Sequence, residues 1–395
     1  VRFGTDWQRV SLTFTPRKRW CYVLAGPDLR KTDETPTPPK RATLWLDAVQ
    51  LQRGGKATAF VTRDPAELGI ATGRPGNVFR WGEKVELRLR VANADPEQAI
   101  APQLDLRLTD FLGRDLWQMT LSSFVPAARS IEQRAAVGQQ GEQRGLLRLH
   151  ARLRLNNAVL AERTLRLAVI PSHEAKDSRF GVNHAYPWPH LLDRCREAGL
   201  TWFRDWSLKW IDVEPEKGRF TFAGTDHQID RVVGRGLSIL CMLPFPSAPW
   251  SSTAPAVLRD KGDYISRRHT VAYAPRDAAE FENYVQRTVG HYKGRVRWWQ
   301  VFNEPVFTTY SLPRKFGYTA KDYATWTQAF VRAARRADPE CKILAGMGYI
   351  RGGQIADDWE QFLAAGGHRG IDAVDIHHYP RMRPPEFIEE LLEDL

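Results

Sequence analysis

The stretch Trp298-Trp299-Gln300-Val301-Phe302-Asn303-Glu304-Pro305 decides how the second half of this chain is interpreted. Its first part is apolar and aromatic, which is typical of a strand buried within a sheet. Pro305 lacks the backbone N–H that a sheet ladder needs, so it marks the end of the strand. Glu304 is therefore expected at the rim of the sheet, where apolar surroundings raise the pKa of a carboxyl group and suit it to general acid catalysis. An ordinary turn with the same tripeptide is the alternative.

From about residue 173 the sequence alternates between short apolar strands and amphipathic helices, which predicts parallel strands covered by helices. Besides the Glu304 strand, strands are expected over Arg179–His184, Leu200–Trp206, Leu237–Leu243, Lys342–Gly346 and Ala373–Tyr379. Helices are expected over Pro189–Ala198, Asp226–Arg235, Asp277–Tyr292, Ala320–Ala337 and from Pro385 towards Leu395. These six β/α units predict an α/β TIM-type (β/α)8 barrel, whose strands seven and eight are expected beyond the end of this chain.

The first 172 residues are expected to be all-β. In residues 56–172, apolar residues such as Val85, Leu87 and Leu89 alternate with charged ones, and turns separate the strands, which predicts an immunoglobulin-like β-sandwich. Residues 1–55 contain two strand-like segments, Trp7–Phe14 and Thr43–Leu51. The ending Leu-Trp-Leu-Asp-Ala-Val-Gln-Leu of the second resembles the last strand of jelly-roll carbohydrate-binding modules. Three domains are thus expected: the C-terminal part of such a module over 1–55, the sandwich over 56–172 and the barrel over 173–395.

Candidate site residues lie at the carboxyl ends of the expected barrel strands, where barrels carry out their chemistry. The polar, charged and aromatic residues at or near these ends are His184, Arg204, Trp206, Trp250, Asn303, Glu304, His377 and Tyr379. Arg204 is expected to point inward, since it shares a strand face with Trp206, although a pair with the neighbouring Asp205 is an alternative.

Two neighbouring histidines at the sixth strand invite a metal hypothesis. Adjacent strand residues point to opposite faces, so His377 and His378 cannot share an ion, and His378 is interpreted as a core histidine. The chain's 4 cysteines have no metal-ligand spacing. No metal or cofactor is therefore expected.

The Trp-x-x-x-Asn-Glu-Pro pattern resembles the acid/base strand of the clan A glycoside hydrolases, which are retaining enzymes built on (β/α)8 barrels. Within this clan the chain is nearest to families 39 and 5. The resemblance implies that Glu304 is the general acid/base and that Asn303 hydrogen-bonds the sugar 2-hydroxyl, with a structural cap as the alternative for Asn303. It also implies that Arg204 keeps the nucleophile ionised and that the hydroxyl of Tyr379 lies near that nucleophile.

The same resemblance places the nucleophile on a glutamate at the end of strand seven, which is expected outside this chain. Glu386, Glu389, Glu390 and Glu393 are interpreted as the solvated face of a helix and not as nucleophiles. The predicted function is hydrolysis of β-glycosidic bonds in an oligo- or polysaccharide by a retaining double displacement, which needs two carboxyl groups roughly 5 Å apart.

The net charge of +11 raises the question of a nucleic-acid partner. The basic residues are scattered, however, and many form the wet face of strands, as in Leu147–Leu155, so no nucleic-acid partner is expected. No apolar run is long enough to cross a membrane. The resemblance of residues 1–55 to a carbohydrate-binding module favours an extracellular or periplasmic location. Two rival functions remain: a carbohydrate-binding barrel without catalysis, and a basic polyanion-binding protein whose affinity falls steeply with salt. The oligomeric state is left open.

Overall fold

The structure is a computed structural model, which describes residues 6–16, 43–60, 62, 64–138, 144–173, 178–183, 187–348 and 353–377. The chain divides into two compact units: Val1–Gly73 with Lys84–Leu167, and Arg74–Glu83 with Ala168–Leu395.

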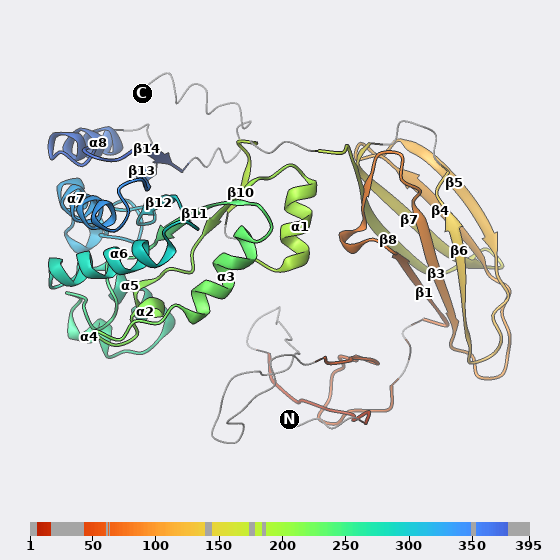
Figure 1. Ribbon diagram of the computed structural model, residues 1–395. Helices are drawn as coiled ribbons and strands as arrows, with labels where there is room; N and C mark the ends of the chain where they lie inside the picture. Colours follow the sequence, from red (N-terminus) through yellow and green to blue (C-terminus); the bar gives the residue numbers. More distant parts are fainter. Residues whose placement is uncertain are drawn as a thin grey trace. The chain divides into compact units, whose positions relative to one another are not determined.

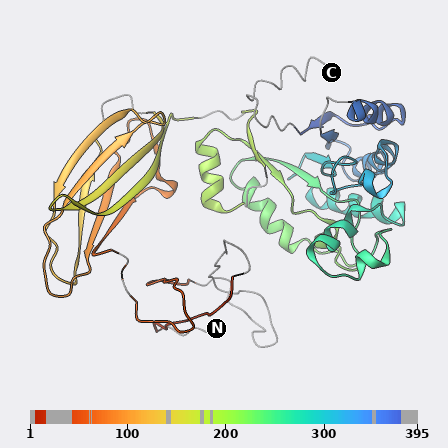
Figure 2. The same ribbon diagram turned by 180° about the vertical axis from the view of Figure 1, so that it is seen from behind.

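The N-terminal strands form two sheets (Figures 1 and 2). One has the strand order β1-β3-β6 and the other β2-β8-β7-β4-β5. The strands are β1 (Ala66–Thr72), β2 (Val78–Arg80), β3 (Glu86–Asn93), β4 (Gln103–Thr109), β5 (Asp115–Ser122), β6 (Ser130–Ala136), β7 (Gly145–Leu155) and β8 (Ala158–Ile170). Leu87, Leu89 and Val91 of β3 are buried while the residues between them are mostly exposed. The predicted all-β character is confirmed for residues 66–170, and an immunoglobulin-like topology stays a prediction.

The strands expected over Trp7–Phe14 and Thr43–Leu51 are not formed. The described residues of both segments have no regular secondary structure, and Trp7 and Trp45 are 74% and 76% exposed. A strand needs a neighbour for its backbone hydrogen bonds, and neither segment pairs with another strand among the residues that the structure describes. The jelly-roll origin of residues 1–55 stays a prediction.

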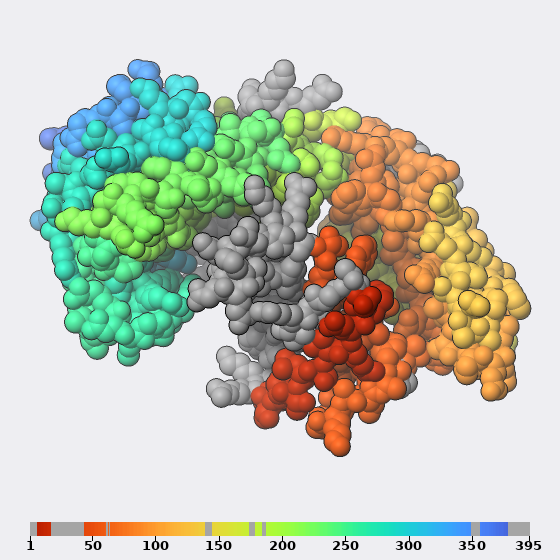
Figure 3. Space-filling view, turned by 60° about the horizontal axis from the view of Figure 1, so that its bottom comes forward, coloured from red at the N-terminus to blue at the C-terminus, as the bar shows by residue number. Residues whose placement is uncertain are grey.

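The second unit contains a six-stranded sheet with the order β14-β13-β12-β11-β10-β9, and every pair in it is parallel. The strands are β9 (Gly181–Asn183), β10 (Trp202–Asp205), β11 (Ser238–Leu243), β12 (Trp298–Val301), β13 (Lys342–Gly348) and β14 (Ala373–Ile376). Their spatial order follows the sequence, as in a barrel wall. In the space-filling view, the residues coloured green to blue form one packed body (Figure 3). The six predicted parallel strands are confirmed as a curled half-barrel.

Helices connect these strands (Figure 1). They are α1 (Pro189–Glu197), α2 (Trp210–Val213), α3 (Ala223–Val233), α4 (Ala256–Arg259), α5 (Tyr264–Ala272), α6 (Ala278–Tyr292), α7 (Ala320–Ala337) and α8 (Gly353–Ala364). The predicted bounds of α7 are confirmed, and a capping box of Thr319 and Asp322 starts this helix. The short helices α2, α4 and α5 and the connecting helix α8 were not predicted. The helix expected from Pro385 lies outside the described residues.

The core lies between the parallel strands and the helices α6 and α7. Trp299 of β12 is fully buried, and so are Tyr284 of α6 and Phe330 of α7. On the same core, the ring of Trp210 stacks on Tyr284 with centroids 4.8 Å apart. Burial of such aromatic side chains contributes about 1.5–3 kcal/mol each, so this core fixes the strand ends against the helices.

Strands β13 and β14 approach each other closely beneath the strand ends. A Cβ atom at Gly346 would overlap the backbone of Asp375, so only glycine fits at this position. Between Ala345 and Gly348 the register shifts by one residue, which is a β-bulge. The extra residue lies on β13, and beyond it the backbone N–H of His377, directly after β14, donates to the Gly348 carbonyl at 3.2 Å.

We predict that Gly346→Ala destabilises the second unit by about 2 kcal/mol or more, because the added methyl group must push β13 and β14 apart. Gly290→Ala is the matched control. Gly290 lies within α6, where a new Cβ would make only an ordinary 3.8 Å contact with Ala337. That variant is expected to be neutral or about 1 kcal/mol more stable. Urea unfolding followed by tryptophan fluorescence measures both, and equal stability of the two variants would contradict the tight approach.

Candidate active site

The corner after β12 carries Glu304 at the carboxyl edge of the sheet. The strand ends at Val301, earlier than the sequence suggested, and Phe302, Glu304 and Val306 then adopt positive φ angles of 56°, 45° and 69°. Side chains other than glycine rarely adopt this conformation, so the neighbouring structure must hold it. The Thr308 hydroxyl donates to the Glu304 carbonyl at 2.8 Å and is one such support. Glu304 is 8% exposed, so its carboxyl group lies in largely dry surroundings.

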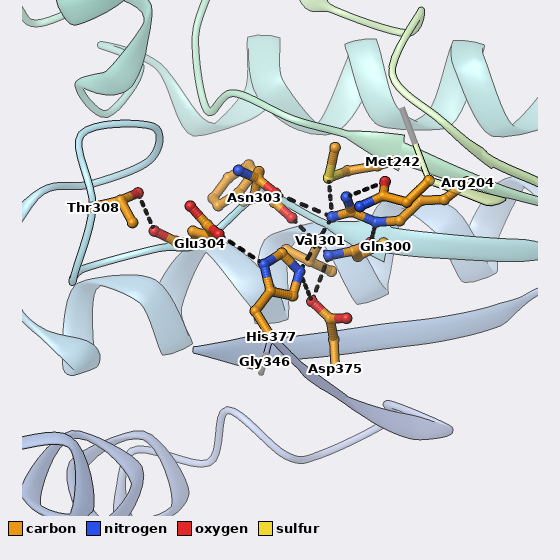
Figure 4. A network of polar contacts seen from close by, with 12 residues as sticks. Arg204, Met242, Gln300, Val301, Asn303, Glu304, Thr308, Gly346, Asp375 and His377 are labelled. Atoms are coloured by element: carbon orange, nitrogen blue, oxygen red, sulfur yellow. Dashed lines mark hydrogen bonds and ion pairs between the residues drawn. The ribbon is translucent and has the colours of Figure 1, made fainter. Parts of the chain in front are cut away.

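Arg204 at the end of β10 links several strands through its guanidinium group (Figure 4). Its Nε donates to Gln300 Oε1 at 2.7 Å, and its Nη1 donates to Asn183 Oδ1 at 3.1 Å. Its Nη2 donates to Asn303 Oδ1 at 3.1 Å and lies 2.9 Å from the Met242 sulfur. The inward orientation predicted for Arg204 is confirmed. It holds the Asn303 side chain directly beside Glu304.

The alternative pair of Arg204 with Asp205 is wrong. Asp205 is fully buried on the other face of β10, where it accepts hydrogen bonds from Ser207 and from Gln228. Its burial raises the pKa of its carboxyl group, and these hydrogen bonds oppose the rise. Adjacent strand residues point to opposite faces, which separates Asp205 from Arg204.

His377 bridges two carboxyl groups just beyond β14 (Figure 4). Its Nδ1 lies 2.9 Å from Glu304 Oε1, and its Nε2 lies 3.2 Å from Asp375 Oδ2. Asp375 Oδ2 also accepts a hydrogen bond from the side-chain amide of Gln300 at 2.6 Å. The network therefore runs from Arg204 through Gln300, Asp375 and His377 to Glu304.

Burial lowers the pKa of His377, but hydrogen bonds to Asp375 and Glu304 outweigh that effect and raise the pKa to about 9. The nearby Arg204 cation also acts to lower it. At neutral pH the imidazole is thus a cation, and both ring nitrogens donate, one to each carboxylate.

The predicted aromatic residues separate into two groups. Trp206 lies at the site: its ring is 5.6 Å from the Arg204 guanidinium carbon and makes edge contacts with Phe245 and Tyr310. Trp250 packs against the core instead, where its ring meets Trp210 edge-on and its indole N–H donates to the Glu214 carbonyl at 3.1 Å. A sugar contact at Trp250 stays a prediction that these contacts do not favour.

Two predicted site residues, His184 and Tyr379, lie outside the described residues, as do His378 and the four glutamates after it. Two residues of the network, Gln300 and Asp375, were missed. Asp375 and His377 are two apart on one strand, and a glutamine inside an otherwise apolar strand also signals an inward polar contact.

Among the described residues, no group of three or more His, Cys, Asp or Glu side chains is arranged to hold a metal ion. In the same part of the chain, no helix is long and apolar enough to cross a membrane. The described cysteines Cys195, Cys241 and Cys341 are free thiols.

Comparisons with known proteins point to glycoside hydrolases. The sequence profile of Glycosyl hydrolase family 10 matches residues 204–346, which include Arg204, Asn303 and Glu304. Endo-1,4-beta-xylanase A of Phanerodontia chrysosporium is 28% identical over 137 residues, covering 35% of this chain and 30% of that protein. Endo-1,4-beta-xylanase of Agaricus bisporus is 28% identical over 137 residues, covering 35% of this chain and 37% of that protein. The chain thus spans about a third of the length of these relatives.

A solved structure of a family 39 glycoside hydrolase from Bacteroides cellulosilyticus WH2 is similar in fold. The TM-score is 0.54 at 19% sequence identity, and the match covers 80% of this chain and 59% of that one. The predicted clan is confirmed. The predicted families, 39 and 5, are near but not exact, because the matching sequence profile is that of family 10.

We predict that Arg204→Lys destabilises the second unit by about 2 kcal/mol or more. An ammonium group cannot reach Gln300, Asn183 and Asn303 together, so some of these acceptors, of which Gln300 and Asn303 are buried, lose their charged donor. Arg332→Lys, in the partly exposed pair with Glu282 on α6, is the control and is expected to change stability by less than about 0.5 kcal/mol. Thermal unfolding measures both, and equal midpoints would contradict the linking role of Arg204.

Proposed function

Taking the chain as a clan A glycoside hydrolase, we propose that it cleaves β-glycosidic bonds of an oligo- or polysaccharide with retention of anomeric configuration. Glu304 is the general acid/base in this proposal. The observation that carries it is the buried Glu304 carboxyl group at the carboxyl edge of the half-barrel, hydrogen-bonded by His377 at 2.9 Å and preceded by Asn303. The remaining steps follow from the chemistry of two carboxyl groups.

In the first step Glu304 gives a proton to the glycosidic oxygen as the bond to the anomeric carbon breaks, while a second carboxylate attacks that carbon. In the second step Glu304 takes a proton from water, which attacks the covalent intermediate and restores the original configuration. The second carboxylate is proposed to be a glutamate on a seventh barrel strand, as the clan resemblance implies.

Neighbouring residues support these steps. Arg204 fixes the Asn303 side-chain oxygen at 3.1 Å, which leaves the Asn303 amide group to donate to a sugar hydroxyl. Trp206 lies beside Arg204 and offers an aromatic surface for a sugar ring. A proton-transfer mechanism of this kind works without a cofactor or metal.

The relatives guide the choice of substrate. Both quoted curated relatives are named endo-1,4-beta-xylanases, so a β-1,4-linked xylan is the first polysaccharide to test. Action on such a polysaccharide fits the extracellular or periplasmic location favoured by the sequence.

We predict that Glu304→Gln in the full-length gene product lowers hydrolysis of xylo-oligosaccharides by about 10²–10⁴-fold, because the amide cannot protonate a poor leaving group. Aryl glycosides with an acidic phenol need no such proton, so the variant is expected to form their glycosyl-enzyme intermediate at near wild-type rate. Added azide attacks without a general base and should then release a β-glycosyl azide. Product analysis by NMR measures this.

Glu282→Gln, on the outer helix α6, is the control and is expected to keep wild-type turnover. Unaltered turnover of xylo-oligosaccharides by Glu304→Gln would contradict the acid/base assignment. If the wild-type protein binds the glycan but never hydrolyses it, the rival function of a carbohydrate-binding barrel is correct.

A further inference from the structure

Asp375 is a carboxylate in the site for which the proposed reaction has no role. Its side chain is 16% exposed, next to Glu304 at 10% and His377 at 13%. Three groups that require counter-charge or hydrogen bonds thus lie together in surroundings of low polarity. A buried carboxylate is costly unless hydrogen-bonded, so its contacts indicate what it does.

The contacts of Asp375 leave its carboxylate little freedom to move. Oδ2 accepts from Gln300 Nε2 at 2.6 Å, and Gln300 is in turn held through its oxygen by Arg204. The Gln300 amide also donates to the Phe302 carbonyl at 3.3 Å. A carboxylate fixed in this way restricts the orientation of the imidazole that donates to it, here through Nε2 of His377.

The orientation of His377 decides which atom meets Glu304. With Nε2 directed at Asp375, the opposite ring nitrogen Nδ1 faces Glu304 Oε1 at 2.9 Å. Rotation of the ring would break both contacts at once. Asp375 therefore acts on Glu304 through the imidazole.

The charged groups around His377 come from three elements. Asp375 lies on β14, Glu304 follows β12, and Arg204 lies on β10 with its Nη2 at 3.5 Å from His377 Nε2. Two carboxylates therefore oppose one guanidinium cation, and the balance favours the imidazolium form, in agreement with a pKa raised to about 9.

We propose that Asp375 is a positioning residue that holds His377 charged and aimed at Glu304, so that Glu304 and His377 carry one shared proton as a pair. This inference rests on the proposed function of Glu304. The titration then belongs to the pair and not to either residue alone.

The proton balance of this pair is complete over one turnover. In the resting pair Glu304 is a carboxylate and His377 an imidazolium. When the glycosidic bond breaks, Nδ1 of His377 passes its proton to Glu304, and Glu304 passes one to the leaving oxygen, which leaves a carboxylate and a neutral imidazole. When water attacks the intermediate, Glu304 takes its proton and returns it to Nδ1.

Asp375→Asn tests the proposal through the pH profile of kcat/KM on xylo-oligosaccharides. The amide preserves the shape of the side chain but removes the negative charge that keeps His377 protonated. The pKa that defines the alkaline limb is therefore expected to be lower by about one unit or more. Asp372→Asn is the control. Asp372 lies on the segment leading into β14 and pairs with Lys342 at 2.8 Å, so the pH profile of this variant should match that of the wild type. A limb that stays in place or rises in Asp375→Asn would overturn the proposal.

A second measurement needs no hydrolysis. NMR titration of the His377 ring in the wild-type protein is expected to show a midpoint near 9, and in Asp375→Asn a midpoint lower by about one unit or more. A wild-type midpoint near the ordinary value of about 6.5 would overturn the role of Asp375 even if the variant does not fold. Since this titration is independent of turnover, failure of Glu304 as an acid/base would be seen separately.

Discussion

The need to satisfy the partly buried Arg204 guanidinium group is the constraint on which the rest of the site depends. A cation inside a sheet must have its donors satisfied, and Arg204 meets this need with acceptors on β9 and β12 and in the corner after β12. These contacts orient Gln300 and Asn303 at the same time. The Arg204 side chain thereby fixes the Gln300 amide, which holds Asp375, and the Asn303 amide, which lies beside Glu304.

The corner that presents Glu304 is held at an energetic cost. Left-handed conformations at residues other than glycine cost about 1–2 kcal/mol each, and this corner contains three of them within five residues. Backbone hydrogen bonds from Val306 to Ser311 and from Arg314 to Val306 close the loop behind it, at 3.0 and 2.9 Å. The Ser311 hydroxyl adds a bond to the Pro244 carbonyl after β11. The corner is therefore determined by its surroundings, which is how strained conformations persist at functional sites.

Much of the half-barrel could be predicted because strand and helix periods are local properties of the sequence. The inward face of Arg204 followed from its two-residue spacing to Trp206, and the bounds of α7 followed from the alternation of strands and amphipathic helices. The corrections concern properties set by tertiary contacts. Trp250 looked like a loop residue at the cleft, yet it packs on the core against Trp210, which stacks on Tyr284, since its burial depends on helices distant in sequence. Asp375 was not predicted as a site residue because its role depends on a hydrogen bond from Gln300. The two residues lie on different strands and come together only in the folded sheet.

The configuration of the first sugar product tests the central claim most directly. Freshly cleaved xylo-oligosaccharide, observed by proton NMR before mutarotation, reports whether the anomeric carbon was displaced once or twice. A retaining pair with Glu304 as acid/base, its partner roughly 5 Å away, predicts that the β anomer appears first. Initial appearance of the α anomer would mean a single displacement by water, and would contradict the role of Glu304 as the acid/base of a double displacement.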